Sequence, residues 1–339
     1  MAEKILITRL RYIGDVVLTT PCLRRLRENF PKAEIVYLTQ APYADLLQGH
    51  PHVTRTITID LASYGLREAL ALMWNLKRDR YSIVIDLLTN PRSALLTAST
   101  LARKRVGTYH LSRRWAYNVN VRVAGEVRSA VEHHLEHLRR IGLNAPFCLP
   151  ELFVSEEESA QGRMMLEASG AREPSRTLLL QPGAKWQAKR WPSERFVELA
   201  RLLKNEGLHA VFLAGPGEEE LAGQCADKVS GAGLVAGLNL RELMRILSAC
   251  AGYVGSDGGP MHVSAALRRP TVGIVGPSEP DVWFPYEAGG RAACVYEKIE
   301  CRPCHLHFCE RIDCLKRIEA KTVLARIMEL ISREPGPKG

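Results

Sequence analysis

Apolar runs of strand length alternate with amphipathic runs of helix length along the whole chain, and this order constrains the fold most. The run SIVIDLL (82–88) is apolar almost throughout, as expected for a central strand that is buried on both faces. Strands that alternate with helices form parallel sheets. The alternation occurs twice, on either side of the polar segment AREPSR (171–176). We therefore predict an α/β protein of two Rossmann-like domains, 1–172 and 173–332, facing a central cleft, with a disordered tail over 333–339.

The expected elements follow from hydrophobic periodicity. Strands are expected at 4–9, 34–38, 54–59, 82–88, near Val106, and at 177–183, 208–214, 252–255 and 270–275. Helices are expected at 16–29, 65–77, 92–102, 130–141, 193–205, 217–229, 239–248 and 320–332. The basic and aromatic segment 109–128 is expected to be irregular. The helix 130–141 carries His133, His134 and His137, but no acid or cysteine cluster lies nearby. We therefore expect a solvated helix there rather than a metal site.

The balance of charge limits the classes of partner. Lys and Arg number 46 against 37 Asp and Glu, which gives a formal net charge of +9. This favours nucleic acid, an anionic membrane surface or a phosphorylated substrate. Nucleic acid is not expected, because no recognised binding motif occurs and the basic residues are dispersed. The sequence shows no run of 18 apolar residues and no signal-peptide layout, so we expect a cytoplasmic protein whose nine cysteines form no structural disulfides.

The segment YVGSDGGPMHVSAALRRPTVGIVGP (253–277) reads as strand, turn, helix and strand. Ser256 and Asp257 are residue types that cap helices, and the pair Gly258 and Gly259 precedes a proline suited to a first helical turn. Such a turn presents bare N–H groups at the positive end of a helix, which suits a phosphate or diphosphate. Asp257 would then meet a sugar hydroxyl or a backbone amine, because a carboxylate repels phosphate. An ordinary capped helix explains the same residues.

Asp15 follows the first predicted strand, directly after Gly14. An exposed carboxylate at this position can act as a general base, although Asp15 can also cap the helix that follows. The loop QPGAKWQAKRWP (181–192) follows another strand and holds three cations. Lys185, Lys189 and Arg190 suit phosphate contact, whereas the alternative is a solvated basic face.

A further loop, FLAGPGEEELAG (212–223), leaves a strand through a Gly-Pro-Gly turn and enters a helix. An acid at this point of a nucleotide-binding unit often binds the ribose hydroxyls, which is the expected role of Glu218. The alternative is an acid that only complements the helix dipole. The sequence does not rank Glu218 against Glu219 and Glu220.

Four cysteines lie within fourteen residues near the end of the chain: Cys301, Cys304, Cys309 and Cys314. Their number fits a structural zinc site or an iron–sulfur cluster, but the last two spacings are not those of a zinc ribbon. A loop of reduced thiols packed beside the C-terminal domain is the alternative. The sequence contains no Asp-x-Asp pair to hold a divalent ion on a diphosphate. A helix N-terminus and lysines would have to stabilise a departing diphosphate, so we expect no cofactor for catalysis.

Four segments in this order resemble the bacterial heptosyltransferases that build the inner core of lipopolysaccharide, glycosyltransferase family 9. They are RYIGDVVLTTPCLRRLRENFP, IVIDLLTNPRSALL (83–96), QPGAKWQAKRWPSERF and, most specifically, SDGGPMHVSAALRRPTVGIVGPSEPDVWFP. The resemblance covers most of the chain. It implies a GT-B fold and transfer of heptose from ADP-heptose to a core sugar with inversion at the anomeric carbon.

The resemblance also implies residue roles. Asp15 would take the proton of the acceptor hydroxyl, and Lys189 would bind the diphosphate and offset the charge of the leaving group. Glu218 would hold the adenosine ribose, and Asp257 would contact the heptose. The other residues expected to bind the donor are Lys185, Gly258, Gly259 and His262. Many relatives have a hydroxyl residue where this chain has Gly258, so one side-chain contact to phosphate is expected to be missing.

The implied acceptor is an anionic glycolipid anchored in the membrane, so the resemblance places a monomeric enzyme transiently at the inner face of the inner membrane. Cations of the N-terminal half would meet its phosphates and carboxylates: Arg9, Arg11, Arg92, Arg113 and Arg114. Two alternatives remain from the residues alone. One is a GT-B transferase or an epimerase that uses another nucleotide sugar, and the other is a non-catalytic nucleotide-binding protein.

Overall fold

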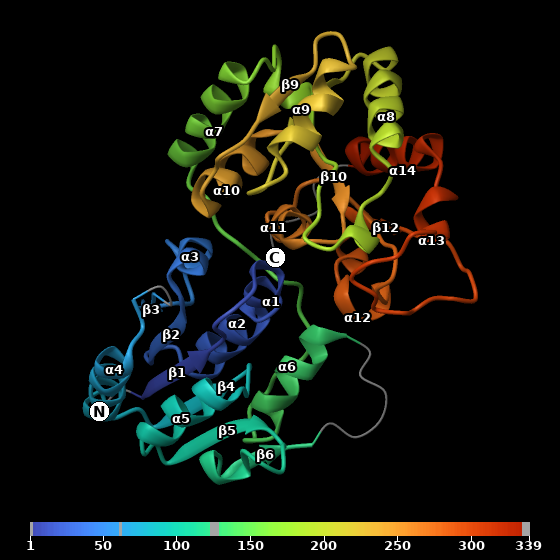
Figure 1. The fold of residues 1–339 in the computed structure, drawn as a ribbon. Helices are drawn as coiled ribbons and strands as arrows, with labels where there is room; N and C mark the ends of the chain where they lie inside the picture. Colours follow the sequence, from blue (N-terminus) through green and yellow to red (C-terminus); the bar gives the residue numbers. More distant parts are fainter. Residues whose placement is uncertain (1–2, 61–62, 123–128, 334–339) are drawn as a thin grey trace. The chain divides into compact units, whose positions relative to one another are not determined.

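The structure, a computed structural model, describes residues 3–60, 63–122 and 129–333. The chain divides into two compact units, one ending at Phe153 and the other beginning at Val154. Each unit contains one parallel sheet of six strands, so the predicted α/β class with two parallel sheets is confirmed (Figure 1). Within the described ranges, no helix is long and apolar enough to cross a bilayer.

The sheet of the first unit has the order β3-β2-β1-β4-β5-β6. Its strands are β1 (Lys4–Thr8), β2 (Glu34–Gln40), β3 (Arg55–Ile59), β4 (Ile83–Asp86), β5 (Lys104–Thr108) and β6 (Val119–Val121). Its helices are α1 (Ile13–Val17), α2 (Thr20–Asn29), α3 (Ala41–Ala44), α4 (Leu66–Arg78), α5 (Pro91–Ser99) and α6 (Ala130–Arg139). The strand order reverses between β1 and β4, which is where open α/β sheets bind their ligands, at the carboxyl ends of the strands.

The sheet of the second unit repeats this topology with the order β12-β11-β10-β7-β8-β9, so its reversal lies between β7 and β10. Its strands are β7 (Thr177–Gln181), β8 (His209–Leu213), β9 (Gly233–Val235), β10 (Gly252–Ser256), β11 (Thr271–Ile274) and β12 (Ala292–Val295). Its helices are α7 (Glu156–Ala168), α8 (Ser193–Asn205), α9 (Glu219–Asp227), α10 (Leu240–Ala249), α11 (Gly259–Ala266), α12 (Pro280–Trp283), α13 (Asp313–Lys316) and α14 (Ala320–Ser332).

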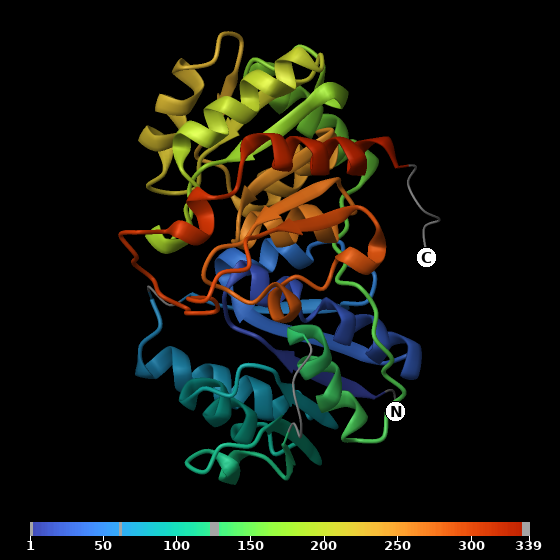
Figure 2. The ribbon, with the colours of Figure 1, turned by 90° about the vertical axis from the view of Figure 1, so that its right-hand side faces the viewer.

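The core of the second unit fixes the loop that precedes α8. Trp191 is almost fully buried, stacks edge-on against Phe196 and donates its indole N–H to the carbonyl of Ile318, 3.1 Å away. Helix α14 begins two residues after Ile318 and packs beside α8 (Figures 1 and 2). The loop 181–192 therefore ends in an anchored aromatic side chain, which holds its preceding residues in place.

The division between the units falls about twenty residues earlier than the expected boundary at 172. The reason is α7, for which the sequence analysis assigned no element. It packs along α10, and the Nε of Arg241 donates to Glu158 Oε1 at 2.6 Å. Its start carried a readable signal, because Ser155 and Glu158 form a capping box. The expected disordered tail lies outside the described residues apart from Arg333.

The first predicted helix, 16–29, is instead two helices. The break follows from Pro21, which lies in the first turn of α2 and has no N–H to donate to Val17. The hydroxyl of Thr20 donates to the carbonyl of Val17 instead, at 2.8 Å, and the hydroxyl of Thr19 donates to that of Val16 at 2.7 Å. Segment 109–128 is also less irregular than expected, because β6 lies within it; its residues 123–128, including Arg128, lie outside the described ranges.

The expectation of a solvated helix at 130–141 is wrong for two of its three histidines. His134 and His137 are buried, because α6 presents this face to the core, and Nδ1 of His134 lies 3.2 Å from the carbonyl oxygen of Leu18. The His137 ring lies 3.0 Å from the hydroxyl of Thr108 and 3.0 Å from the carbonyl of His133. Burial, with the nearby His133 ring, lowers the pKa of His137 to about 3. Burial likewise lowers the pKa of His50, whose ring packs against that of Phe153, to about 4.

These histidines make the first unit sensitive to acid. The unfolded chain protonates them near pH 6.5, whereas the folded chain does so only near pH 4 and below, so the free energy of unfolding falls as pH drops from about 6.5. We expect His50 alone to contribute a loss of about 3 kcal/mol by pH 4. Urea unfolding at pH 7, 5.5 and 4.5 measures this, and His50→Asn should reduce the pH dependence. Identical pH dependence in both proteins would contradict the assignment.

Candidate active site

In the first unit, Asp15 lies at the carboxyl end of β1, in the first turn of α1. Its Oδ2 accepts the backbone N–H of Tyr12 at 3.0 Å, so the capping role is real. Its Oδ1 accepts from Nη2 of Arg9 at 2.5 Å, and about a fifth of its side chain is exposed. The carboxylate is therefore held by two donors and still reaches solvent, which leaves a general-base role open to it.

Arg9 joins the two strands at which the order of this sheet reverses. It follows β1, and its Nη1 donates to the carbonyl of Leu87, directly after β4, at 2.5 Å. The loop after β4 is itself fixed, since Asp86 accepts the N–H groups of Leu88 and Thr89 at 3.0 and 2.9 Å. The sequence analysis assigned Arg9 to the acceptor and missed that it orients Asp15; acceptor binding by Arg9 stays a prediction.

The structure places the other expected acceptor-binding cations in three loops or helix starts of the first unit. Arg11 is exposed and lies over the ring of Tyr12. Arg92, in the first turn of α5, lies over the ring of Tyr64 and is exposed. Arg113 is half-buried and Arg114 exposed, both on the connection from β5 to β6. Their roles also stay predictions.

In the second unit, an ion pair bridges the two strands at which the order reverses. Lys189, at the end of the loop that follows β7, places its Nζ 2.5 Å from Oδ2 of Asp257, which directly follows β10. The side chains are 17% and 6% exposed, respectively. Residues 68 positions apart in the sequence thus meet at the switch point of this sheet, as the sequence analysis expected for ligand-binding residues.

The pair is charged. Burial raises the pKa of the Asp257 carboxyl, but the neighbouring Lys189 ammonium and a hydrogen bond from Ser278 at 2.7 Å outweigh burial, and the pKa lies below its usual value. Asp257 is therefore an anion at neutral pH, which favours contact with sugar hydroxyls or with cations over contact with phosphate. Ser278, in the loop after β11, was missed by the sequence analysis, and no local signal distinguishes it from other loop serines.

The loop 181–192 is supported by the cysteine segment. Nζ of Lys189 lies 4.7 Å from the centre of the Trp186 ring, which stacks on His307 at 3.7 Å. The carbonyl of His307 accepts the N–H of Ala188, and the N–H of Cys309 donates to Gln187 Oε1, both at 3.1 Å. Segment 301–314 thus holds the short 3₁₀ turn Gln187–Lys189 that presents Lys189.

The four cysteines of this segment are free thiols that range from exposed Cys301 to buried Cys314. In the part of the chain that the structure describes, no three His, Cys, Asp or Glu side chains are grouped so that they could hold a metal ion. A structural metal bound by these thiols stays a prediction. What the segment shows is a packing role beside Lys189.

Glu218 stands apart from its two neighbours. Its Oε2 accepts from the N–H of Gly215 and from Nε2 of Gln181, both at 3.1 Å, whereas Glu219 and Glu220 are exposed. A Cβ on Gly183 would lie only 2.1 Å from the Glu218 carboxyl carbon, so that glycine is required for this side chain to lie across the end of β7. Gln181, which the sequence analysis missed, fixes the arrangement.

The remaining residues expected to bind the donor lie around the start of α11. Gly258 is the residue before the helix and Gly259 its first residue. His262 is buried in α11 with its Nδ1 3.0 Å from the hydroxyl of Tyr286. Lys185 is exposed in the loop after β7. The structure brings Lys189, Asp257 and the start of α11 together, and it does not test the binding roles of these residues.

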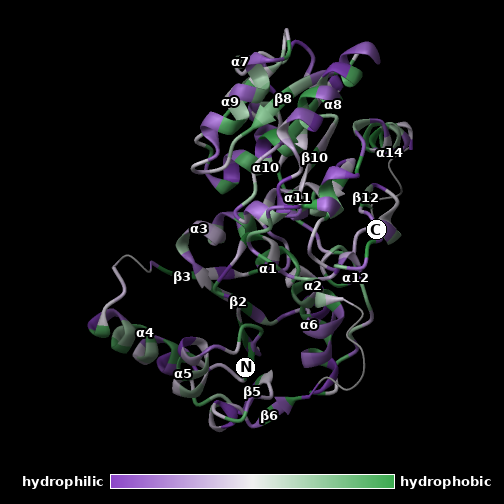
Figure 3. Ribbon diagram, turned by 45° about the vertical axis from the view of Figure 1, so that its right-hand side comes forward, coloured by the Kyte–Doolittle hydropathy of each residue, from purple (hydrophilic) through white to green (hydrophobic). Residues whose placement is uncertain are grey.

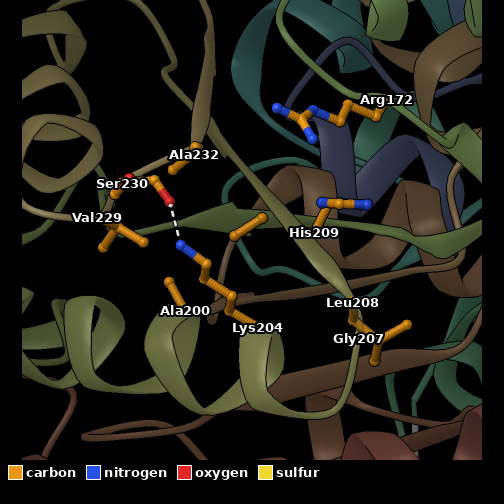
Figure 4. Close-up of a pocket in the computed structure, with 11 residues that line it drawn as sticks. Arg172, Ala200, Lys204, Gly207, Leu208, His209, Val229, Ser230 and Ala232 are labelled. Carbon is orange, nitrogen blue, oxygen red and sulfur yellow. Dashed lines mark hydrogen bonds between the residues drawn. The ribbon is translucent and has the colours of Figure 1, made fainter.

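Two cavities of the second unit differ in their relation to this cluster. One, of about 470 Å³, lies beside Ser278 and the loops that follow β11 and β12. The other, of about 220 Å³, lies near the amino-terminal end of β8, which begins at His209 (Figure 4). There Lys204 donates to the carbonyl of Ser230 at 3.0 Å. Ligands of open α/β sheets bind at the carboxyl ends of strands, so the cavity beside Ser278 is the candidate.

Comparisons with known proteins show which family this chain resembles. A model of glycosyltransferase family 9 (heptosyltransferase) matches residues 69–311. Lipopolysaccharide heptosyltransferase 2 of Escherichia coli (strain K12) is 29% identical over 296 residues, covering 82% of this chain and 84% of that protein. The E. coli ADP-heptose LPS heptosyltransferase II structure has a TM-score of 0.81 at 26% identity, over 97% and 98% of the chains. A family 9 glycosyltransferase from Veillonella parvula DSM 2008 has a TM-score of 0.84 at 24% identity, over 97% of both chains.

The two parallel sheets, with charged side chains at their switch points, and the match to a heptosyltransferase structure place the chain in the GT-B class of sugar transferases. The family model spans more than two thirds of the chain. This chain belongs to glycosyltransferase family 9, the heptosyltransferase family, and is a glycosyltransferase.

Proposed function

We propose that this enzyme transfers heptose from ADP-heptose to the inner core of lipopolysaccharide, with inversion at the anomeric carbon. The observation that carries the proposal is the Lys189–Asp257 pair at the switch point of the second sheet, next to the first turn of α11. An ammonium group and free helical N–H groups suit a diphosphate, and an ionised carboxylate beside them suits the hydroxyls of the attached sugar. The names of the relatives support heptose and lipopolysaccharide as the reactants.

In the proposed reaction, the acceptor hydroxyl attacks the anomeric carbon while Asp15 takes its proton. The bond from that carbon to the diphosphate oxygen breaks, and ADP leaves. Lys189 and the N–H groups of Gly258 and Gly259 offset the charge that develops on the departing diphosphate. Glu218 holds the adenosine ribose, with Gln181 fixing its carboxylate. One base is sufficient, because inversion needs proton removal only on the face opposite the leaving group.

Arg9 acts through Asp15 in this proposal. A guanidinium that donates to both Asp15 and the Leu87 carbonyl sets the direction of the carboxylate. The acceptor is anionic and carried by a lipid, so the enzyme meets it at the inner face of the membrane. Arg11, Arg92 and Arg113 are proposed to contact its phosphates or carboxylates, together with Arg114.

Product analysis tests the proposal. Purified enzyme is incubated with a lipid-free inner-core acceptor and with ADP-heptose, a UDP-sugar or a GDP-sugar, and the product is examined by mass spectrometry and NMR. We expect transfer from ADP-heptose alone, with the opposite anomeric configuration in the product. Transfer from another nucleotide sugar would favour the alternative GT-B enzyme, and thermal stabilisation by ADP-heptose without turnover would favour a nucleotide-binding protein.

A substitution at Gly258 tests the position of the donor through an expected increase in ADP affinity. Its backbone is extended, and a Cβ placed on it would meet nothing nearer than the Ser256 carbonyl oxygen at 3.6 Å. Gly258→Ser should therefore fit without strain and add a hydroxyl next to the proposed diphosphate. We expect the Kd for ADP to fall by about threefold to tenfold, as one added hydrogen bond would give. Calorimetry measures this, and weaker binding would argue against a diphosphate beside Gly258.

A further inference from the structure

Helix α4 of the first unit has two apolar faces, although it needs only one to pack. Leu72, Met73 and Leu76 lie against the core formed with β1, β2 and β4. On another face, Leu66, Leu70 and Trp74 are 78%, 57% and 65% exposed. Residues four apart form one stripe along a helix, so these three large side chains project together. Figure 3 shows hydrophobic and hydrophilic residues interleaved along this helix at the edge of the unit.

Cations accompany this exposed stripe. At 3.6 residues per turn, Lys77 falls within the sector of the stripe, and Arg67 and Arg78 border it on the side of Trp74. All three are exposed. We call Leu66, Leu70 and Trp74, with these three cations, the α4 surface.

Acidic groups do not offset this charge. Glu68, the acid within α4, projects away from the stripe and accepts the N–H of Gly65 at 3.0 Å. Asp79, just after the helix, forms ion pairs with Arg55 and Lys4. The α4 surface is therefore both apolar and positively charged, and more than half of each of its three large side chains is exposed.

We propose that the α4 surface docks on an anionic lipid bilayer. Trp74 and the two leucines enter the level of the headgroups, and the three cations face lipid phosphates. A leucine and tryptophan stripe flanked by Lys and Arg is the composition of helices that lie in a membrane interface. The charge selects this occupant over a second copy of the chain, because a two-fold contact through α4 would bring like charges together.

Elements next to α4 also expose large apolar side chains. Helix α5 packs beside α4 and exposes Leu95, and the 3₁₀ turn Arg114–Ala116, which packs on α5, exposes Trp115 (Figure 1). Three apolar side chains and three cations should give weak membrane binding that salt can reverse. The docking does not rest on the proposed reaction, because it is measured without turnover.

Co-sedimentation with vesicles tests the docking. Full-length enzyme is mixed with vesicles of phosphatidylethanolamine, phosphatidylglycerol and cardiolipin, or of phosphatidylcholine alone. We expect binding to the anionic vesicles only, with loss in 0.5 M NaCl. Leu70→Ser/Trp74→Ser and Arg67→Glu/Arg78→Glu should each reduce the partition coefficient at least tenfold. The matched control, Met164→Ser/Trp283→Ser, removes two exposed apolar side chains of the second unit and should bind like the wild type.

Equal partitioning of the α4 variants and the wild type would overturn the proposal, as would absence of wild-type binding. Light scattering without lipid adds a further outcome: a wild-type dimer that the α4 variants convert to a monomer would assign the surface to a second copy. The Leu70→Ser/Trp74→Ser variant should keep wild-type turnover with the lipid-free acceptor. Vesicle binding without any transfer would remove the proposed reaction and leave the docking intact.

Discussion

We expect the Asp15→Asn variant to lose about three orders of magnitude in kcat while it keeps the donor affinity of the wild type. Asparagine has nearly the same shape as aspartate but cannot take a proton from the acceptor hydroxyl. Donor affinity should not change, because the residues proposed to hold the donor belong to the second unit. Initial rates of ADP release measure kcat, and calorimetric titration with ADP measures affinity. A variant that retains a tenth or more of the wild-type kcat would remove Asp15 from the role of base.

Two controls separate the base from its surroundings. Arg9→Lys keeps the charge beside Asp15, but an ammonium cannot reproduce the fork that donates to both Asp15 and Leu87. We expect a loss of about tenfold in kcat, well short of that for Asp15→Asn. In Asp15→Ala, the Arg9 guanidinium remains as an anion site, so added formate should restore part of the rate. Formate should have no effect on the Arg9→Lys enzyme.

For Lys189→Met, we expect kcat/KM to fall by about 100- to 1,000-fold, the usual cost of removing one group that stabilises developing charge. The change also leaves the buried Asp257 carboxylate without its ammonium partner. Breaking such a pair from one side destabilises a protein by about 3 kcal/mol or more. The second unit should therefore unfold at a lower urea concentration. Steady-state kinetics and urea unfolding measure the two effects separately.

The double variant Lys189→Met/Asp257→Asn distinguishes catalysis from stability. Removing both charges leaves no unpaired ion, so most of the lost stability should return. The rate should not return, because the group beside the diphosphate is still absent. A double variant that regains both stability and rate would mean that Lys189 serves only as a structural partner of Asp257.

Much of the fold could be predicted because most of the parallel strands coincide with an apolar run in the sequence. The strands at β1, β7 and β10, and helices α8 and α14, appear within one or two residues of their expected limits. Strands β6, β9 and β12 were missed, since they are short and lie at sheet edges. Helix α7 was missed although its capping box at Ser155 was readable.

The positions of the candidate site residues at the ends of the strands were predictable, but their side-chain partners were not. Loops that follow strands at a switch point are fixed by topology, so Asp15, Lys189 and Asp257 could be named from the sequence. The contacts that orient them depend on residues far away in the chain. Arg9 reaches Leu87, and Lys189 reaches Asp257, across strands that only the folded sheet brings together. No local pattern reveals such pairs.

The burial of His134 was also beyond the sequence. Histidines that face a core and histidines that face water have the same helical spacing, and only the packing of α6 on the sheet separates them.

The boundary between the two units, at Phe153 and Val154, matters for the construction of chimeras from family members. A chimera spliced near residue 172 would graft a foreign α7 onto α10 and bury mismatched surfaces, including the site where Arg241 meets Glu158. A crossover placed before α7 keeps every helix with the sheet it covers. Under the residue roles proposed above, halves exchanged at that point would carry acceptor preference and donor preference separately.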